Sequence, residues 1–229
     1  MAVRMANAVL WALPLLLAAS AARAENICHR GGGNDVSIIL QYSEDIRPIR
    51  LKIDRRYFDQ RFIPQYDSVV RAKVLDLQAT DFAPWPEGLR AHMSEGPYLS
   101  LLIATANDLE LVAQRFTSMT LGYRLTDTVQ WRDTDGPFGL KRLGAPPPSD
   151  PLTGGLFGRD DVYIARDTQG AVTDVIRCKR PGDTPFQTCN HLVETGVADL
   201  KLLYALDYLP DWHRLSREAR AFYSCIRDN

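Results

Sequence analysis

The sequence lacks the short motifs that mark the commonest hydrolases and zinc enzymes. It has no Gly-x-Ser-x-Gly elbow, no His-Glu-x-x-His pair and no Cys-x-x-Cys knuckle. These are the spacings that bring a nucleophile or a set of metal ligands together. The glycine run at 31–33 has no strand before it, and the run at 154–158 has no Lys-Ser or Lys-Thr after it. Neither run predicts a phosphate-binding loop, and we expect no cofactor.

The sequence also lacks an excess of charge of one sign. Its 27 basic side chains are balanced by 28 acidic ones, while 45% of all residues are apolar and 24% are charged. This is the composition of an ordinary folded protein with no overall field to attract phosphates. Asp54 and Asp59 interrupt the densest basic stretch, 47–61, which therefore predicts a salt-bridged surface. We expect no nucleic-acid partner.

Long apolar runs are absent except for one near the beginning. Met5–Ser20 is almost wholly apolar, follows Arg4, and precedes an Ala-Arg-Ala triplet that ends at Ala24. This order predicts a secretory signal peptide at 1–24, cut after Ala24. The alternative is a membrane anchor, for which a run of this length interrupted by Pro14 is short. We expect a periplasmic protein whose mature chain has no membrane span.

Cysteines are few, but their number is even. Cys28, Cys178, Cys189 and Cys225 all follow the predicted cleavage point and allow three pairings. An oxidising compartment favours two disulfides. Cys178 and Cys189 flank turn-forming residues at 179–185 between two strand-like segments, so we expect a bridge across that hairpin. Cys28 and Cys225 then tie the mature amino end to the last helix.

A metal site is the alternative interpretation of the same cysteines. Cys189 and His191 are two residues apart, on one face of the expected strand, and Cys178 and His213 are not far along the chain. These residue types bind zinc. Because the sequence has no Cys-x-x-Cys knuckle, we favour the disulfides and expect no metal ion.

The first part of the mature chain, 25–132, is predicted to be a strand-rich unit with one helix. Runs rich in β-branched and other apolar residues predict strands at 36–42, 46–53, 69–80 and 98–105. The first two strands are expected to form a hairpin, and Pro48 places the second at a sheet edge. Asn107 is expected to cap a helix with apolar residues at helical spacing over 109–116.

The remainder divides into a connection and a second unit. The stretch 133–158 is rich in Gly and Pro, which predicts a long loop or linker. In 159–229, apolar runs joined by tight turns predict an antiparallel meander of four strands, followed by an amphipathic helix that begins after Asp211. The expected fold class is α+β, with two strand-rich units of antiparallel sheet, each backed by a helix.

A series of short motifs in the second unit carries a family resemblance. In chain order they are Ile176-Arg177-Cys178, Pro185, Cys189-Asn190-His191, Leu202-Leu203-Tyr204 and Leu209-Pro210-Asp211-Trp212. This order resembles the C-terminal region of periplasmic immunity proteins that neutralise phospholipase and related effectors of type VI secretion, and of uncharacterised proteobacterial relatives. The first unit is similar to their N-terminal region, through 49–53 before Tyr57 and 75–77 before Phe82.

The resemblance implies a non-catalytic protein that binds a secreted effector toxin in the same compartment and occludes it. The missing catalytic motifs are compatible with that role. Two other interpretations stay open: a structural or adaptor protein of the cell envelope, and an envelope hydrolase that uses His191 or His213 with nearby carboxylates.

If the partner is a protein, exposed aromatic side chains are the best candidates for contacting it, since such anchors dominate binding energies. Phe82 and Trp85 belong to a proline-stiffened loop, and Phe138 belongs to the Gly/Pro-rich stretch. Asp133 and Asp135 supply carboxylates beside Phe138. We expect these five residues to bind the partner. The alternatives are packing of the rings under their loops, and ordinary turn positions, a calcium site or an acid/base pair for the carboxylates.

Overall fold

The structure is a computed structural model that describes residues 27–28, 33–41, 47–89, 96–124, 127–149, 160–180, 182 and 185–228. The predicted signal peptide at 1–24 lies outside the described residues, as does 150–158 of the Gly/Pro-rich stretch. Within the described ranges, no helix is both long and apolar enough to cross a membrane.

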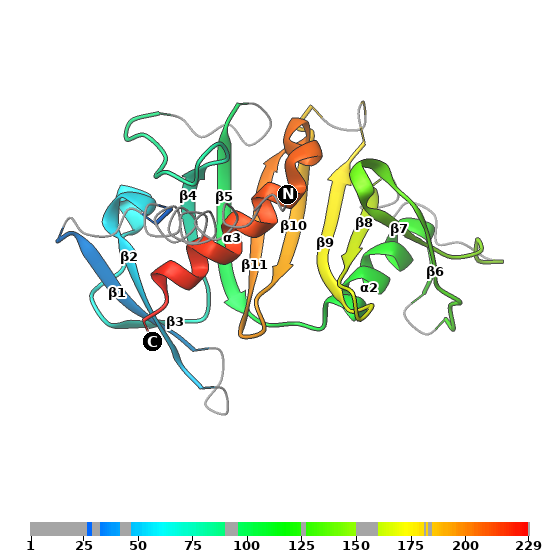
Figure 1. Ribbon diagram of the computed structural model, residues 1–229, viewed down its shortest axis with the longest axis horizontal. Coiled ribbons are helices and arrows are strands. Elements are labelled where there is room, and N and C mark those ends of the chain that lie inside the picture. The colour runs from blue at the N-terminus through cyan, green and yellow to red at the C-terminus, as the bar shows by residue number, and fades with distance from the viewer. Residues whose placement is uncertain are drawn as a thin grey trace, which may run out of the picture.

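An eight-stranded sheet extends across most of the molecule (Figure 1), and all of its ladders are antiparallel. In spatial order its strands are β4 (Lys73–Gln78), β5 (Tyr98–Thr105), β11 (Ala198–Ala205), β10 (Thr188–Glu194), β9 (Val172–Lys179), β8 (Asp160–Arg166), β7 (Lys141–Gly144) and β6 (Arg132–Asp135). The meander β8 to β11 confirms the prediction from tight turns between apolar runs. Because β5 pairs with β11, strands from both halves of the chain continue one sheet.

A three-stranded sheet lies at one end of the molecule (Figure 1). Its order is β2 (Ile49–Asp54), β1 (Asp35–Leu40) and β3 (Ser68–Val70). β1 and β2 form the predicted antiparallel hairpin, and β3 runs parallel to β1. Pro48 directly precedes β2, which lies at the edge of this sheet. An edge position suits proline, because proline has no backbone N–H group to donate to a neighbouring strand. Two 3-10 helices follow β2, namely η1 (Arg55–Tyr57) and η2 (Gln60–Phe62).

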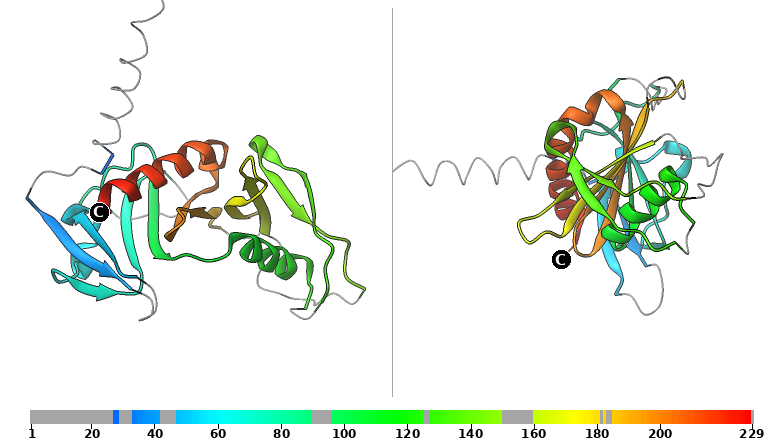
Figure 2. Two further views of the ribbon diagram at one scale, coloured as in Figure 1. Left: turned by 60° about the horizontal axis from the view of Figure 1, so that its bottom comes forward. Right: turned by 90° about the vertical axis from the view of Figure 1, so that its right-hand side faces the viewer.

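Two α-helices lie on opposite faces of the large sheet (Figure 2). α3 (Trp212–Ile226) follows the 3-10 helix η4 (Leu206–Asp211), begins where the sequence predicts, and packs against β10 and β2. α2 (Leu109–Leu121) packs against β8 and β9 instead of the strands of its own half. The α+β class with antiparallel strand-rich units is therefore confirmed, and each helix contacts strands of the other half of the chain.

The expected cap of α2 is wrong by one residue. The side chain of Asp108 accepts a hydrogen bond from the backbone N of Leu111 at 3.1 Å, which makes Asp108 the N-cap. Asn107 instead donates its backbone N–H and its side-chain amide to Asp199 of β11, at 2.8 and 2.6 Å. Asn107 thus fixes the start of α2 to the sheet.

Most of the buried apolar side chains lie in the core between α3 and the sheets. This core contains Tyr57, Phe82, Leu101, Leu202, Tyr204 and Phe222 among others. A smaller core lies under α2, where Leu109 and Ala113 contact Val175 and its neighbours on β8 and β9. The sheet separates the two cores, so β8, β9 and β10 contribute apolar side chains to both of them.

Part of the Gly/Pro-rich stretch is regular structure, because its first turn-forming residues, Gly136, Pro137 and Gly139, lie at the end of a hairpin. β6 and β7 pair over Arg132–Asp135 and Lys141–Gly144. Between them lies the 3-10 turn η3 (Pro137–Gly139). Gly139 has a φ of 78°, a left-handed backbone conformation that glycine adopts more readily than residues with a side chain.

Both predicted disulfides are present. Cys178 and Cys189 face each other on the paired strands β9 and β10, and Cys28 is joined to Cys225 near the end of α3. Neither of the strand cysteines retains a free thiolate, so the alternative zinc site at Cys189 and His191 loses its sulfur ligands.

Candidate protein-binding site

A groove lies beside β4, the edge strand of the large sheet, and has a volume of about 900 Å³. Residues 56–61, around η1 and η2, form one wall, and residues 84–89 form the other. Asp76 of β4 lines the groove as well. We call this feature the Trp85 groove, because Trp85 is its largest side chain.

The loop that carries Trp85 is fixed to the edge of the sheet. Pro84 forms a bridge with Leu77, and the backbone N–H of Trp85 donates to the carbonyl of Asp76 at 3.0 Å. The indole ring packs edge-on against Tyr98 at a centroid distance of 5.1 Å, and its N–H donates to the carbonyl of Leu89 at 3.2 Å. The half-buried ring is therefore held in one position at the surface.

Two carboxylates of the groove have partners within this chain. Asp59 and Arg61 form a salt bridge of 2.7 Å, and this hydrogen bond lowers the pKa of Asp59 to about 2. Tyr98 donates its hydroxyl to Asp76 at 2.7 Å, and burial, followed by this hydrogen bond, raises the pKa of Tyr98. Glu87 is exposed and has no ion pair among the described residues, so the groove offers a partner apolar contact and a free carboxylate.

One exposed apolar side chain lines the groove. Leu89 is 59% exposed and belongs to the same loop as Trp85. Four further exposed apolar side chains precede this loop in the sequence, namely Phe62, Tyr66, Val69 and Val74. Leu89 was not among the predicted contacts, because a single leucine in a loop has no pattern.

Phe82 lies away from the surface, although it belongs to the same loop as Trp85. Its ring is fully buried and faces Phe222 of α3 at a centroid distance of 6.1 Å. Its carbonyl accepts a hydrogen bond from Tyr57 at 3.1 Å. The backbone of Phe82 has a φ of 59°, and this left-handed turn directs the ring into the core. Of the two predicted aromatic residues in this loop, only Trp85 is accessible to a partner.

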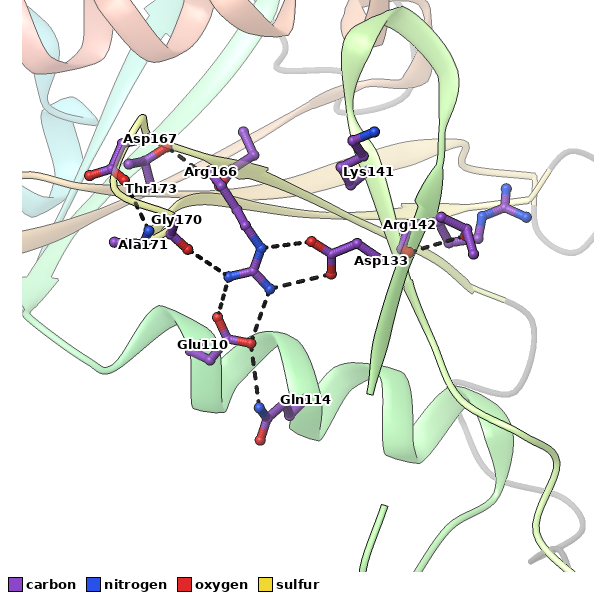
Figure 3. Close-up of polar contacts among 12 residues, drawn as sticks. Glu110, Gln114, Asp133, Lys141, Arg142, Arg166, Asp167, Gly170, Ala171 and Thr173 are labelled. Atoms are coloured by element: carbon purple, nitrogen blue, oxygen red, sulfur yellow. Dashed lines mark hydrogen bonds and ion pairs between the residues drawn. The ribbon is translucent and has the colours of Figure 1, made fainter. Parts of the chain in front are cut away.

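Asp133 is occupied by an internal ion pair. Arg166 of β8 lies between Asp133 of β6 and Glu110 of α2 (Figure 3), with shortest distances of 2.8 and 2.6 Å. It also donates to the carbonyl of Gly170 at 3.0 Å. Hydrogen bonds to Glu110 and Asp133 raise the pKa of the guanidinium, which stays charged. Arg166 therefore connects the β6–β7 hairpin to α2.

Replacing Arg166 with Gln is expected to reduce the free energy of unfolding by about 1–2 kcal/mol, since two partly buried carboxylates lose their shared cation. Chemical denaturation of both proteins measures the difference. The matched control is Lys141→Gln, which removes an exposed 2.7 Å pair with Asp135 and is expected to cost less than about 0.5 kcal/mol. Equal losses in the two variants would contradict the role given to Arg166.

The end of the β6–β7 hairpin presents the remaining two predicted residues. Phe138 is 52% exposed and has a φ of 55°, and its carbonyl accepts the indole N–H of Trp212 at 3.0 Å. Asp135 is almost fully exposed apart from its salt bridge to Lys141. The hairpin end and the Trp85 groove lie near opposite edges of the large sheet, so the structure does not bring the five predicted residues together.

A buried polar cluster beneath α3 was missed by the sequence reasoning. Asp174 of β9 and His191 of β10 are 2.9 Å apart, and Tyr204 lies 3.2 Å from the second ring nitrogen of His191. Ser216 and Arg220 of α3 both donate to Asp174. The signal that could have found it is the position of Asp174 on the inward face of a strand, between Val172 and Ile176.

The charge state of this cluster follows from its contacts. Burial alone would raise the pKa of Asp174, but the hydrogen bond from His191, together with the charge of Arg220 and the hydroxyl of Ser216, holds it well below its usual range. His191 is completely buried, so it offers no accessible imidazole to a substrate. His213 is exposed and stacks on Trp212 at 3.8 Å, with no carboxylate bound to it among the described residues.

The fold of this chain is similar to that of known proteins, although its sequence is not. No protein-family model matches the sequence, and no curated protein matches it. Smlt3025, an immunity protein of the Stenotrophomonas maltophilia type IV secretion system, has a similar structure, with a TM-score of 0.59 and a sequence identity of 16%. The similarity covers 85% of this chain and 94% of the Smlt3025 chain. The Neisseria meningitidis iron-regulated outer membrane lipoprotein FrpD gives a TM-score of 0.44 at 12% identity, over 86% and 93%. The chain thus has a fold that is also found in a bacterial secretion-system immunity protein.

Proposed function

We propose that the protein is exported and acts as an immunity protein, which binds a toxin delivered by a bacterial secretion system and blocks it without catalysis. The observation that carries the proposal is the fold it shares with a secretion-system immunity protein over 85% of this chain. The accessible indole of Trp85, held rigidly beside the exposed side chain of Leu89, supplies a surface suited to a protein partner. Two disulfides agree with export to the periplasm.

The motif order of the second unit favours a type VI effector, with a phospholipase as the first candidate for the toxin. The immunity protein of similar fold serves a type IV system. The secretion system and the toxin's activity are therefore properties to be measured, and both follow from the effector that the protein binds.

The test is survival of cells that produce the toxin in the periplasm. The candidate toxins are the products of the reading frames on either side of the gene for this protein, each directed to the periplasm. Residues 1–229 are expected to restore growth, whereas a chain without residues 1–24 is expected to leave the cells unprotected. Absence of protection by the full chain, together with absence of binding, would contradict the proposed function.

The same pair of proteins distinguishes occlusion from catalysis. When the toxin's activity is titrated with the purified protein, inhibition by occlusion is complete near a one-to-one molar ratio. Full inhibition far below that ratio would show turnover and contradict a non-catalytic mechanism.

Replacing Trp85 with Ala is expected to weaken toxin binding about 30-fold, since a rigid aromatic anchor at an interface contributes about 2 kcal/mol or more. Isothermal titration with a catalytically inactive toxin measures the change. Phe186→Ala is the control, because Phe186 is an aromatic residue that is 63% exposed and lies between β9 and β10, outside the groove. A loss below threefold for Trp85→Ala would exclude the groove as an anchoring site.

A further inference from the structure

A row of side chains crosses the large sheet on the face opposite α3. The strand register aligns Val74, Leu102, Lys201, Leu192, Val175 and Ile164, one from each of six successive strands. Directly paired residues project to the same face of a sheet. Lys201 is thus the single charged residue in an otherwise apolar row.

α2 covers only one end of this row. Leu192, Val175 and Ile164 are buried in the small core beneath that helix. Among the described residues, no helix lies over the other end, where Val74 is 48% exposed and Leu102 and Lys201 are partly exposed. Sheet faces with this apolar content are normally covered.

A second row runs beside the first and joins it to the Trp85 groove. Asp76, Ser100 and Leu203 are aligned on β4, β5 and β11, on the same face as Lys201. Asp76 also lines the Trp85 groove. We call Val74, Leu102, Lys201, Ser100 and Leu203 the open sheet face, and it is continuous with the groove through Asp76.

Lys201 is without a counter-charge in the described part of the chain. No ion pair or hydrogen bond there involves its ammonium group, whereas Arg177, Asp76 and Asp199 on the same face each have a partner, which is Asn107 in the case of Asp199. Arg177 pairs with Asp160 at 3.3 Å, and Asp76 accepts the hydroxyl of Tyr98. Burial, followed by the charge of Arg177, lowers the pKa of Lys201. A partly buried ammonium beside apolar neighbours destabilises a protein unless a carboxylate compensates it.

We propose that the open sheet face is the main docking surface for the toxin, and that the toxin supplies an Asp or Glu, surrounded by apolar side chains, which pairs with Lys201. This inference rests on the proposed function. The complementary chemistry is one carboxylate within an apolar patch, which is how a protein surface matches an isolated cation at an interface.

Other occupants fit this surface less well. One unpaired cation is far fewer than the several that a nucleic-acid backbone requires. A second copy docked through the same face would bring two unpaired ammonium groups into one interface, where like charges oppose association. A protein of complementary charge is therefore the occupant that the face favours.

Lys201→Met is expected to stabilise the free protein and to weaken its binding to the toxin. Because methionine keeps the length of the side chain without its charge, the melting temperature of the free protein is expected to rise by about 2–4 °C. The dissociation constant for a catalytically inactive form of the toxin that the protein neutralises is expected to increase at least tenfold, since the toxin's carboxylate loses its partner. Differential scanning calorimetry and isothermal titration measure the two values on the full mature protein.

Leu102→Glu provides a second variant with a different physical basis. Leu102 is directly opposite Lys201 on β5, so the new carboxylate satisfies the ammonium within the protein. The variant is expected to keep the melting temperature within about 3 °C of the wild type and to bind the effector at least tenfold more weakly. Arg217→Met, on the exposed side of α3, is the matched control and is expected to change affinity less than twofold.

The outcomes separate the docking surface from the function. If the wild type binds and protects but both variants keep its affinity, the docking surface is wrong and the proposed function stands. If the wild type neither binds nor protects, both are wrong. A lower melting temperature in Lys201→Met would show that another segment of this chain already compensates the ammonium, which overturns the proposal. A wild-type dimer that Leu102→Glu dissociates would overturn it in favour of a second copy.

Discussion

Replacing both Cys28 and Cys225 with Ser is expected to reduce the free energy of unfolding by about 5 kcal/mol, the largest effect of any change considered. The two residues are 197 positions apart, and a crosslink that closes so long a loop removes much conformational entropy from the unfolded chain. In the native state the bridge fixes residues 27–28 to α3, and Arg227, the residue after α3, pairs with Leu51 of β2. Urea denaturation of the exported protein and its variant measures the loss.

The matched control for this bridge is the second disulfide. Cys178 and Cys189 are only 11 positions apart and already paired across β9 and β10, so replacing both with Ser is expected to cost about 3 kcal/mol. If the short-range bridge proves the more important of the two, the loop-entropy explanation is wrong for this protein.

Replacing Asp174 with Asn is expected to reduce the free energy of unfolding by about 3 kcal/mol at pH 7. The carboxylate is buried among His191, Ser216 and Arg220, and removing its charge leaves those donors imperfectly paired. Asp135→Asn is the control, because that carboxylate also forms an ion pair but is almost fully exposed, and it is expected to cost less than about 0.5 kcal/mol.

The effect of Asp174→Asn depends on pH in a direction set by its lowered pKa. A carboxyl whose pKa is lower in the folded state stabilises the fold above its ordinary pKa near 4, and this stabilisation declines as pH falls toward the folded-state value. The difference between wild type and variant is therefore expected to be constant from pH 5 to 8 and to shrink below about pH 4. Denaturation curves across that range measure it, and a difference that grows in acid would contradict the assignment.

Local patterns predicted the second half of the chain well. The strands of the meander are apolar runs separated by short turns, and α3 has apolar residues at helical spacing over Trp212–Ile226. The cysteine pairing followed from the turn-forming residues between Cys178 and Cys189. Each of these features depends on a few neighbouring residues, so it could be predicted from the sequence alone.

Contacts between segments far apart in the sequence could not be predicted from local patterns. The pairing of β5 with β11 joins segments about a hundred residues apart, and the packing of α2 on β8 and β9 depends on that sheet order. The hairpin β6–β7 was hidden because its strands are four residues each and its turn is rich in Gly and Pro. Phe82 was predicted at the surface from its proline-rich loop, whereas a left-handed turn places it in the core.

The candidate binding surface shows the same division. Trp85 was predicted to contact a partner because it is an aromatic residue in a proline-stiffened loop, and its side chain is accessible in the structure. Lys201 has no sequence signal, since a lysine alternating with leucines is what any strand with one exposed face contains. Its importance comes from the register that surrounds it with apolar residues and from the limited reach of α2.

Hydrogen exchange of the free and effector-bound protein locates the contact surface without any substitution. Binding of the inactive effector is expected to slow exchange of the amides in β4, β5, β11 and residues 84–89, and to leave the exposed side of α3 unchanged. Slowed exchange confined to α3 or to the β6–β7 hairpin would contradict the proposed docking surface.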